Sequence, residues 1–338
     1  MAKLSKGWKI TVIIASVIVG LLLLLLITYL ILVLSGKSRF HKNDRDISAS
    51  NIKGLEVDDG VVTYKGKNYI LDPDVVSVLF IGIDKEKIGD DFGIGSNGQA
   101  DTLFVMTLNT KTKAIRIIPI PREAMVDVDI FSPKGKYTGA RNEQICLSYA
   151  YGKDPEKSAE NTLKSASRLL LNINISNYVT MDLRGISAIT DIIGGISLTA
   201  IEDIPELGCK TGDTLNLDGK KARIYLQSRT EDAEGSSKRL ERQKQFMTAF
   251  ASKAGNKISE DFGLLKTYYD KMKPYTSTDL SFSQITYLAS TGIVRNLGGQ
   301  FDYQTINGEK KVGEKWVEFY PDSDSLVTAI LNTFYKQK

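Results

Sequence analysis

Asp84, Asp101 and Arg122 are the residues whose types and positions are most suited to chemistry, because each stands at the end of a segment predicted to be a β-strand. Carboxylates bind hard divalent cations, and a guanidinium group binds phosphate oxygens in pairs. If these three side chains meet at one sheet edge, they would suit a metal ion together with a phosphate. The alternative is a strand-end salt bridge that binds no ligand.

The spacing of two apolar segments predicts that Asp101 and Arg122 do meet. The segments 102–108 and 114–120 are separated by a short polar turn that begins at Asn109. Such a turn makes the two strands antiparallel neighbours. The start of the first strand, next to Asp101, would then lie beside the end of the second, next to Arg122.

A second group of polar residues lies later in the chain and begins with Arg229. Arg239, Arg242 and Gln243 follow at spacings of three and four residues, which place them on one face of a helix. Two cations on one face repel each other unless an anion lies opposite. The group could therefore bind phosphate, or it could be an ordinary solvated helix face.

Composition excludes several other kinds of site. The only histidine is His41, so the body of the chain has neither a Ser-His-Asp triad nor a histidine zinc site. Cys146 and Cys209 could form a disulfide or remain two separate buried thiols. The net charge is +4, and three of its lysines precede the first apolar run, so the remainder has no basic footprint for nucleic acid.

The segment Gly93–Gly98 matches the G-x-G-x-x-G pattern of dinucleotide-binding loops. That fingerprint requires a strand before it and a helix after it, whereas a strand beginning at Asp101 follows here. We therefore interpret the segment as a loop. The chain contains no Walker A sequence.

The first apolar run, Ile10–Leu34, has 25 residues and no charge. At about 1.5 Å per residue it exceeds the ~30 Å of a bilayer core. It is longer than the apolar region of a signal peptide, and no small-residue cleavage site follows it. We expect a cytoplasmic tail at 1–9, an uncleaved membrane anchor at 10–34, a polar tether at 35–50 and an extracytoplasmic body at 51–338. Because cations flank both ends of the run, the charge pattern alone leaves the orientation open.

The body reads as one α/β domain, because predicted strands and helices alternate along it. The predicted strands are a hairpin at 61–71 and the segments 75–83, 102–108, 114–120, 178–183 and 196–200. The predicted helices are 155–171, 186–193, 219–228, 238–254, 260–272 and 323–336.

Taken together, the motifs between residues 75 and 250 resemble those of the LytR-CpsA-Psr family of cell-wall enzymes. They are, in order, Phe80–Asp84, Gln99–Leu103, Leu108–Lys113, Ile120–Glu123, Tyr149–Gly152, Asp191–Gly195, Leu217–Gly219, Ser228–Arg229 and Arg239–Gln243. Each piece alone is weak, but the ordered set behind a single amino-terminal anchor is specific.

The resemblance implies a three-layer α/β/α sandwich with a mixed central sheet, on the outer face of the membrane. It implies a phosphotransferase that moves a glycopolymer from an undecaprenyl-pyrophosphate carrier to the C6 hydroxyl of muramic acid in peptidoglycan. Partners would be the polyprenyl-linked glycan, peptidoglycan and membrane lipid, and not nucleic acid. Such phosphoryl transfer depends on positioning and charge neutralisation, so it needs neither histidine nor cysteine.

The resemblance also assigns roles to the polar groups. Asp101, with Asp84 as its partner, would hold Mg²⁺ or Mn²⁺, or Asp101 would act as the base on the acceptor hydroxyl. Arg122 would take part in catalysis. The residues that would bind the pyrophosphate are Arg122, Arg229, Arg239, Arg242 and Gln243. The prenyl chain would enter an apolar channel whose candidate residues are Leu163, Leu169, Leu170, Ile189 and Ile193.

The chain departs from the family pattern at three positions that usually carry cations. Gln99, Gln144 and Gln227 stand there instead. Either the substrate presents fewer charges, or other cations compensate, or transfer activity has been lost. The alternative function is a non-catalytic module that binds prenyl phosphate or wall glycan.

Overall fold

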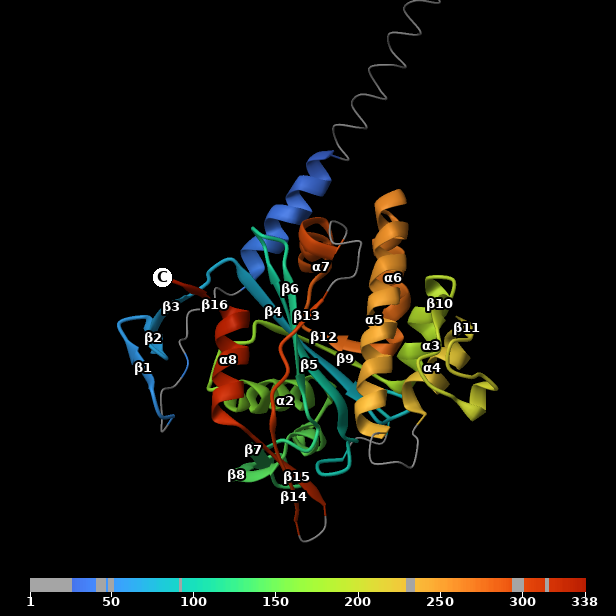
Figure 1. Cartoon of the computed structure of the whole chain (residues 1–338). Helices are drawn as coiled ribbons and strands as arrows, with labels where there is room; N and C mark the ends of the chain where they lie inside the picture. Colours follow the sequence, from blue (N-terminus) through green and yellow to red (C-terminus); the bar gives the residue numbers. More distant parts are fainter. Residues whose placement is uncertain are drawn as a thin grey trace, which may run out of the picture.

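The computed structural model describes residues 26–40, 47, 52–90, 93–228, 235–293, 301–313 and 316–338. Its centre is a six-stranded sheet, shown in Figure 1. In spatial order the strands are β12 (Thr276–Thr278), β9 (Asn177–Met181), β4 (Val75–Ile83), β5 (Ala100–Asn109), β6 (Ile115–Ile120) and β13 (Asp302–Tyr303).

The central sheet is mixed. β4 pairs in parallel with β9 and β6 with β13, while the β4–β5, β5–β6 and β9–β12 pairs are antiparallel. β4 lies in the middle because nearly every residue of its sequence, Val75–Ile83, is apolar and both of its faces can be covered. The predicted α/β fold with a mixed central sheet is therefore confirmed.

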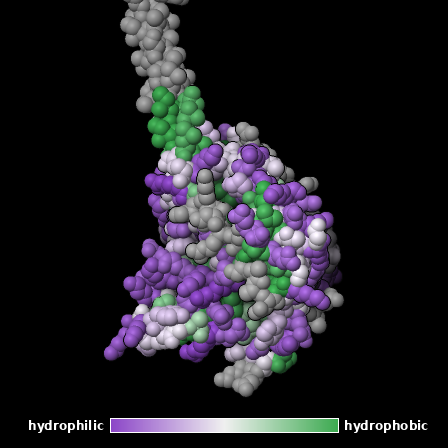
Figure 2. All heavy atoms as spheres, turned by 90° about the vertical axis from the view of Figure 1, so that its left-hand side faces the viewer, coloured by the Kyte–Doolittle hydropathy of each residue, from purple (hydrophilic) through white to green (hydrophobic). Residues whose placement is uncertain are grey.

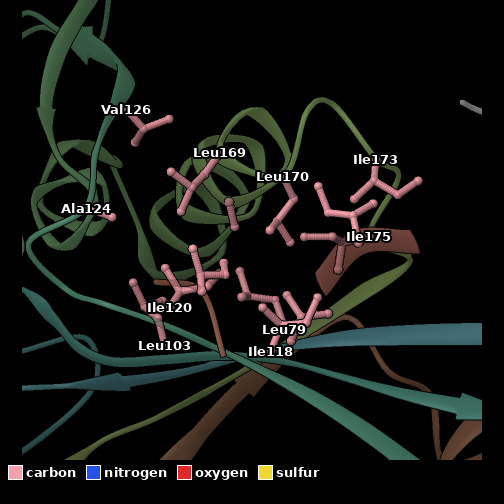
Figure 3. Close-up of a cluster of buried hydrophobic side chains, with 14 of the residues drawn as sticks. Leu79, Leu103, Ile118, Ile120, Ala124, Val126, Leu169, Leu170, Ile173 and Ile175 are labelled. Carbon is pink, nitrogen blue, oxygen red and sulfur yellow. The ribbon is translucent and has the colours of Figure 1, made fainter. Parts of the chain in front are cut away.

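Alternate residues of β4 enter two different hydrophobic clusters, so helices lie on both faces of the sheet. On one face, Leu79 and Ile81 join the largest cluster, which lies against α2 (Pro155–Leu169) and α8 (Ser323–Phe334). Figure 3 shows the part of this cluster between α2 and the sheet. Both helices begin directly after an aspartate whose side chain accepts a backbone N–H of the first turn.

The other face of β4 is covered by α7 (Phe282–Leu288) and by the chain's first described helix, residues 26–39. Val78 packs there with Tyr287 and Phe40. Within the described residues, no helix is long and apolar enough to cross a membrane. Residues 1–25, which include most of the predicted anchor, lie outside the described part of the chain.

The helix of residues 26–39 runs across the expected boundary between the anchor and the tether. It continues past Leu34 into the segment predicted to be a polar tether, and Phe40 after it is buried. Gly36 makes this possible, since a Cβ there would lie 2.0 Å from the backbone oxygen of Ser283. The helix therefore contacts the body along its last turn. Figure 2 shows its outer apolar side chains standing clear of a largely hydrophilic surface.

A lobe beside the sheet has its own hydrophobic cluster. It is formed by α3 (Leu183–Ile192), β10 (Ile196–Thr199), β11 (Thr214–Leu217), α4 (Gly219–Gln227) and α5 (Gly235–Glu260). α3 and α4 cross closely at Gly219, whose N–H donates to Asp191 Oδ1 at 2.7 Å. A Cβ at Gly219 would lie 2.3 Å from Ser187 O. The motifs around Asp191 and Gly219 thus have a packing role.

The remaining elements lie at the periphery. They are β1 (Leu55–Asp58), β2 (Val61–Tyr64), β3 (Lys67–Leu71), β7 (Met125–Phe131), β8 (Tyr137–Gln144), α6 (Leu264–Met272), β14 (Gly308–Val312), β15 (Val317–Pro321), β16 (Tyr335–Gln337) and the short helices 145–151, 205–207, 273–275 and 289–293. The hairpin predicted at 61–71 is confirmed as β2 and β3. The strands after residue 300 were not predicted, because they are short and carry no clear alternation.

Candidate functional site

Asp101 and Arg122 lie opposite each other on neighbouring strands. The β5–β6 register pairs Leu103 with Ile120, and two further residues along each strand bring Asp101 level with Arg122. Arg122 Nη1 donates to Asp101 Oδ1. The predicted proximity of the two residues is therefore confirmed. Both side chains keep access to solvent, at 25% and 32% exposure, so a ligand can reach the pair.

A bulge in β5 sets the position of Asp101. β4 pairs Gly82 with Thr102 and then Ile83 with Ala100, which leaves Asp101 as the extra residue. Bulges of this kind redirect a side chain and are frequent beside active sites. The sequence showed no signal for the bulge, because the residues around it fit a regular strand equally well.

Asp84 and Gln99 close the long loop between β4 and β5. The N–H of Asp84 donates to Gln99 O at 3.1 Å, and the N–H of Gln99 donates to Asp84 Oδ1 at 2.6 Å. The Gln99 side chain then accepts a hydrogen bond from Arg122 Nη2 at 2.9 Å. Asp84, Gln99, Asp101 and Arg122 therefore form one polar cluster at the end of β4, which we call the sheet-edge cluster.

The loop that matches G-x-G-x-x-G is followed by strand β5 and not by a helix, as predicted. It forms hydrogen bonds with the segment Tyr149–Gly152. Gly95 N donates to Ala150 O at 2.7 Å, and Asn97 Nδ2 donates to Gly152 O at 2.5 Å. Asn97 is fully buried. The described part of the loop is thus held in place by hydrogen bonds to the segment Tyr149–Gly152.

Cys146 lies directly behind Arg122, because its N–H donates to Arg122 O at 3.2 Å. Burial raises the pKa of its thiol to about 11, despite the opposing effect of the Arg122 charge. The thiol is therefore neutral at physiological pH and a poor nucleophile. Cys146 and Cys209 are both buried and free, so the disulfide alternative is wrong for this structure.

Arg242 occupies a different environment from the one expected of a phosphate ligand. Its side chain is only 2% exposed, and its Nε lies 2.8 Å from Glu202 Oε1. The guanidinium carbon is 5.7 Å from the centre of the Tyr225 ring. Arg242 Nη2 donates to Ser228 O, so this residue holds the chain directly before Arg229. These contacts give Arg242 a structural role, whereas a phosphate contact stays a prediction without support from its surroundings.

Arg239 and Gln243 are partly exposed on α5. Lys244, the residue after Gln243, lies over the Tyr303 ring at 4.7 Å from its centre. Tyr303 belongs to β13, which pairs with β6, the strand that leads to Arg122. This part of α5 therefore lies beside the central sheet. Arg229, the remaining predicted phosphate ligand, lies outside the described residues.

The three glutamines at positions where the resemblance predicts cations each form a hydrogen bond with another group. Gln99 accepts from Arg122, and Gln227 Oε1 accepts from Arg223 Nε at 3.0 Å. Gln144 Nε2 donates to Val317 O at 2.7 Å. Two of the three positions therefore orient an arginine. Arg223 also forms a two-point ion pair with Glu86, which lowers the pKa of that carboxyl.

The residues proposed to line one apolar channel are divided between two clusters. Leu169 and Leu170 belong to the cluster between α2 and the sheet, as Figure 3 shows, while Ile193 belongs to that of the α3–α4 lobe. The candidate residues therefore do not all line one channel, and the channel for the prenyl chain stays a prediction. A different apolar surface was missed: Phe80 and Phe104 stack at 4.9 Å on the opposite face of the sheet and are partly exposed. Their alternation with buried residues in β4 and β5 was the available signal.

The residues of the sheet-edge cluster fit a magnesium-type ion in chemistry but could not hold one alone. Among the described residues, no group of three or more His, Cys, Asp or Glu side chains could bind a metal. Asp84 and Asp101 supply two hard oxygen ligands, and Mg²⁺ is commonly bound by one or two carboxylates with substrate phosphates and water. A metal at this site would therefore depend on the phosphates of a bound substrate.

The described geometry offers a guanidinium for phosphate oxygens and two carboxylates for a cation. A partly exposed guanidinium, two carboxylates and an amide lie together at the end of a rigid strand pair. An apolar surface lies on the sheet beside them, at Phe80 and Phe104. The charged cluster and the apolar surface together match an amphiphile with a phosphate head and a hydrocarbon chain.

Comparisons with known proteins agree with this reading. The model of the LytR_cpsA_psr family matches residues 32–326. The polyisoprenyl-teichoic acid–peptidoglycan teichoic acid transferase TagU of Enterococcus faecalis is 29% identical over 292 residues, which cover 85% of this chain and 84% of TagU. The corresponding transferase TagV of Bacillus subtilis is 30% identical over 183 residues, 51% of this chain and 42% of TagV.

A solved structure shows the same fold. The crystal structure of Bacillus subtilis TagV matches with a TM-score of 0.62 and 22% identity, over 78% of this chain and 97% of that one.

Proposed function

Because this chain belongs to the LytR_cpsA_psr family, we propose that it is a transferase that attaches a polyprenyl-linked glycopolymer to peptidoglycan. The observation that carries the proposal is the partly exposed Asp101–Arg122 pair, set by a bulge at the sheet edge and matched by the family's order of motifs. The polymer is of the teichoic acid class, since that is what the relatives' names state.

The reaction is a substitution at phosphorus. The C6 hydroxyl oxygen of muramic acid bonds to the phosphorus that carries the polymer, and the bond from that phosphorus to the oxygen of prenyl phosphate breaks. Prenyl phosphate leaves with the electron pair, and the hydroxyl proton passes to Asp101 or, when Asp101 binds the metal, to solvent. Negative charge grows on the phosphate oxygens, and Arg122 is placed to neutralise it.

The other binding roles follow from position. Arg239 and Gln243 on α5, with Arg229, would bind the remaining pyrophosphate oxygens. The stacked rings of Phe80 and Phe104 would contact the prenyl chain. Arg242 would contribute indirectly, because its hydrogen bond to Ser228 O would position the backbone next to Arg229.

We propose that Asp84 and Asp101 hold Mg²⁺ or Mn²⁺ when substrate is present. The metal would supply positive charge to the phosphate oxygens. Removal of divalent ions should then weaken binding of the pyrophosphate donor, which calorimetry measures without any turnover.

The expected membrane topology remains part of the proposal. Residues 1–9 would be cytoplasmic, 10–34 would span the membrane, and the segment to residue 50 would lead to the extracytoplasmic body at 51–338. Protease added to intact cells should cut the body, and full protection would contradict this topology.

The function is tested with the full-length chain in detergent, a prenyl-pyrophosphate-linked teichoic acid precursor, Mg²⁺ and peptidoglycan. We expect release of prenyl phosphate and attachment of labelled polymer to peptidoglycan. Arg122→Ala should abolish both and leave the melting temperature nearly unchanged. Tight donor binding without turnover by the parent chain would instead support the non-catalytic binding module, which the glutamines at positions 99, 144 and 227 favour.

A further inference from the structure

The hairpin of β14 and β15 exposes an unusual amount of apolar surface. Val312 is 89% exposed, Trp316 71% and Tyr320 37%. Val312 lies on one face of the hairpin, while Trp316 and Tyr320 lie on the other, and grouped apolar side chains on a surface mark interaction sites. We call the exposed face that carries Trp316 and Tyr320 the hairpin face.

The hairpin is fixed to the segment that carries Arg122. Phe319 of β15 is buried in the main core, and its N–H donates to Glu123 O at 2.9 Å. Gln144 Nε2 donates to Val317 O on the same strand. The strand β15, which carries part of the hairpin face, is therefore held one residue from Arg122 by one backbone hydrogen bond and one hydrogen bond from a side chain.

Charged groups alternate with the aromatic rings on this face. The register places Lys311 opposite Glu318 and Glu309 opposite Tyr320, and residues directly opposite each other share a face. Lys311 Nζ lies 5.0 Å from the centre of the Tyr320 ring, whose hydroxyl donates to Glu318 Oε2 at 2.7 Å.

Trp316 extends the same alternation. Gly313 N donates to Trp316 O at 2.9 Å, which continues the β14–β15 ladder by one residue. Trp316, Glu318 and Tyr320 are two residues apart, the spacing that places side chains on one face of a strand. The hairpin face thus carries an aromatic ring, a carboxylate and a second aromatic ring in a row, from Trp316, Glu318 and Tyr320. Lys311 lies beside this row.

This combination fits a sugar chain. The C–H face of a pyranose ring is apolar and stacks on an aromatic ring, while its hydroxyls at the edge need hydrogen-bond partners. A purely apolar partner would leave the charged groups of Lys311, Glu309 and Glu318 buried without solvent, which is costly. A strongly acidic polymer would be repelled by the two glutamates.

We propose that the hairpin face binds the glycan strand of the acceptor and presents it to Arg122. This inference rests on the proposed transfer to peptidoglycan. Figure 1 places β14 and β15 at the end of the molecule opposite the helix of residues 26–39. An acceptor approaching from the wall would meet this end first if that helix leads into the membrane.

A fluorescence experiment tests binding directly, because the chain has only two tryptophans, Trp8 and Trp316. In full-length Trp8→Phe protein, Trp316 is the sole tryptophan emitter. Soluble glycan strands, freed of teichoic acid and stem peptides, should shift or quench its emission in a saturable way. An emission change with phosphatidylglycerol vesicles and not with glycan would overturn the proposal, as would a dimer that Trp316→Ala dissociates.

A kinetic experiment tests the role in transfer. Trp316→Ala should raise the peptidoglycan concentration needed for half-maximal rate by about five- to tenfold, the range expected for one aromatic contact. The donor concentration needed for half-maximal rate should not change. Tyr137→Ala is the matched control, since Tyr137 is 51% exposed on the separate β8 strand.

The two experiments separate failure of the inference from failure of the function. An active parent with an unchanged acceptor requirement in Trp316→Ala would overturn the glycan surface and leave the transferase assignment intact. An inactive parent whose Trp316 emission still responds to glycan would overturn the transferase and retain a glycan-binding surface.

Discussion

Replacement of Arg122 by lysine separates the geometry of this residue from its charge. The Arg122 guanidinium donates through Nη1 to Asp101 and through Nη2 to Gln99 Oε1 at 2.9 Å. A lysine ammonium keeps the positive charge but is a point donor, so it cannot reproduce both contacts or grip a phosphate in two places.

The structure sets the size of the expected effects. Arg122 and Asp101 are 25% and 32% exposed, so water screens the pair, and its loss should cost about 1 kcal/mol of unfolding free energy or less. Loss of a fixed donor to a developing oxyanion costs about 2.7–4 kcal/mol in the transition state. At 1.4 kcal/mol per factor of ten, kcat should fall by roughly 100- to 1,000-fold.

Arg116→Lys is the matched control. Arg116 lies on β6, the strand that leads to Arg122; it pairs with Asp302 at 3.1 Å, and its side chain has a similar exposure, 32%. Its replacement should change the urea midpoint about as much as Arg122→Lys does, without changing the release of prenyl phosphate. Turnover of Arg122→Lys within about threefold of the parent would refute our reasoning on the guanidinium geometry. An equal loss of turnover in Arg116→Lys would refute the location of the site.

Three further predictions concern the framework around the site. The thiol of Cys146, whose pKa burial raises to about 11, should resist alkylation at pH 8 in the native protein and react once urea unfolds it. Asp129 is nearly buried between Lys164 and Arg168; burial opposes its charge, but the two cations prevail and lower its pKa. Asp129→Asn should therefore cost about 1–2 kcal/mol at neutral pH. Because a lowered carboxyl pKa stabilises fully above the unfolded value of 3.8 and loses this effect as the pH falls to the lower folded value, the difference in urea midpoint should shrink below pH 3.8. Gly36→Leu should release the helix of residues 26–39 from α7 and speed tryptic cleavage there, whereas Leu34→Ala, at a position 65% exposed, should not.

The sheet-edge cluster was largely predictable from sequence, because the contacts that form it are local. The turn between 102–108 and 114–120 sets which residues of the two strands face each other, and this brought Asp101 opposite Arg122. The place of Asp84 followed in the same way from the end of the apolar run Val75–Ile83. The bulge at Asp101 was not predictable, since it depends on how β5 meets β4 after a long loop.

The surroundings of side chains that the sequence did not predict depended on contacts between distant segments. Arg242 looked like a phosphate ligand because it shares a helix face with Arg239 and Gln243, yet Glu202, forty residues earlier, lies against it in the fold. Helical spacing specifies a face of the helix, but it contains no information on what packs against that face.

The sequence by itself determined the family, the mixed α/β architecture and the pairing at the centre of the site, because these rest on hydrophobic periodicity and turn length. Only the tertiary structure decided which cations remain accessible, where an apolar chain could lie and which aromatic residues face outward. Those properties depend on burial, and burial is decided when elements far apart in the chain pack together.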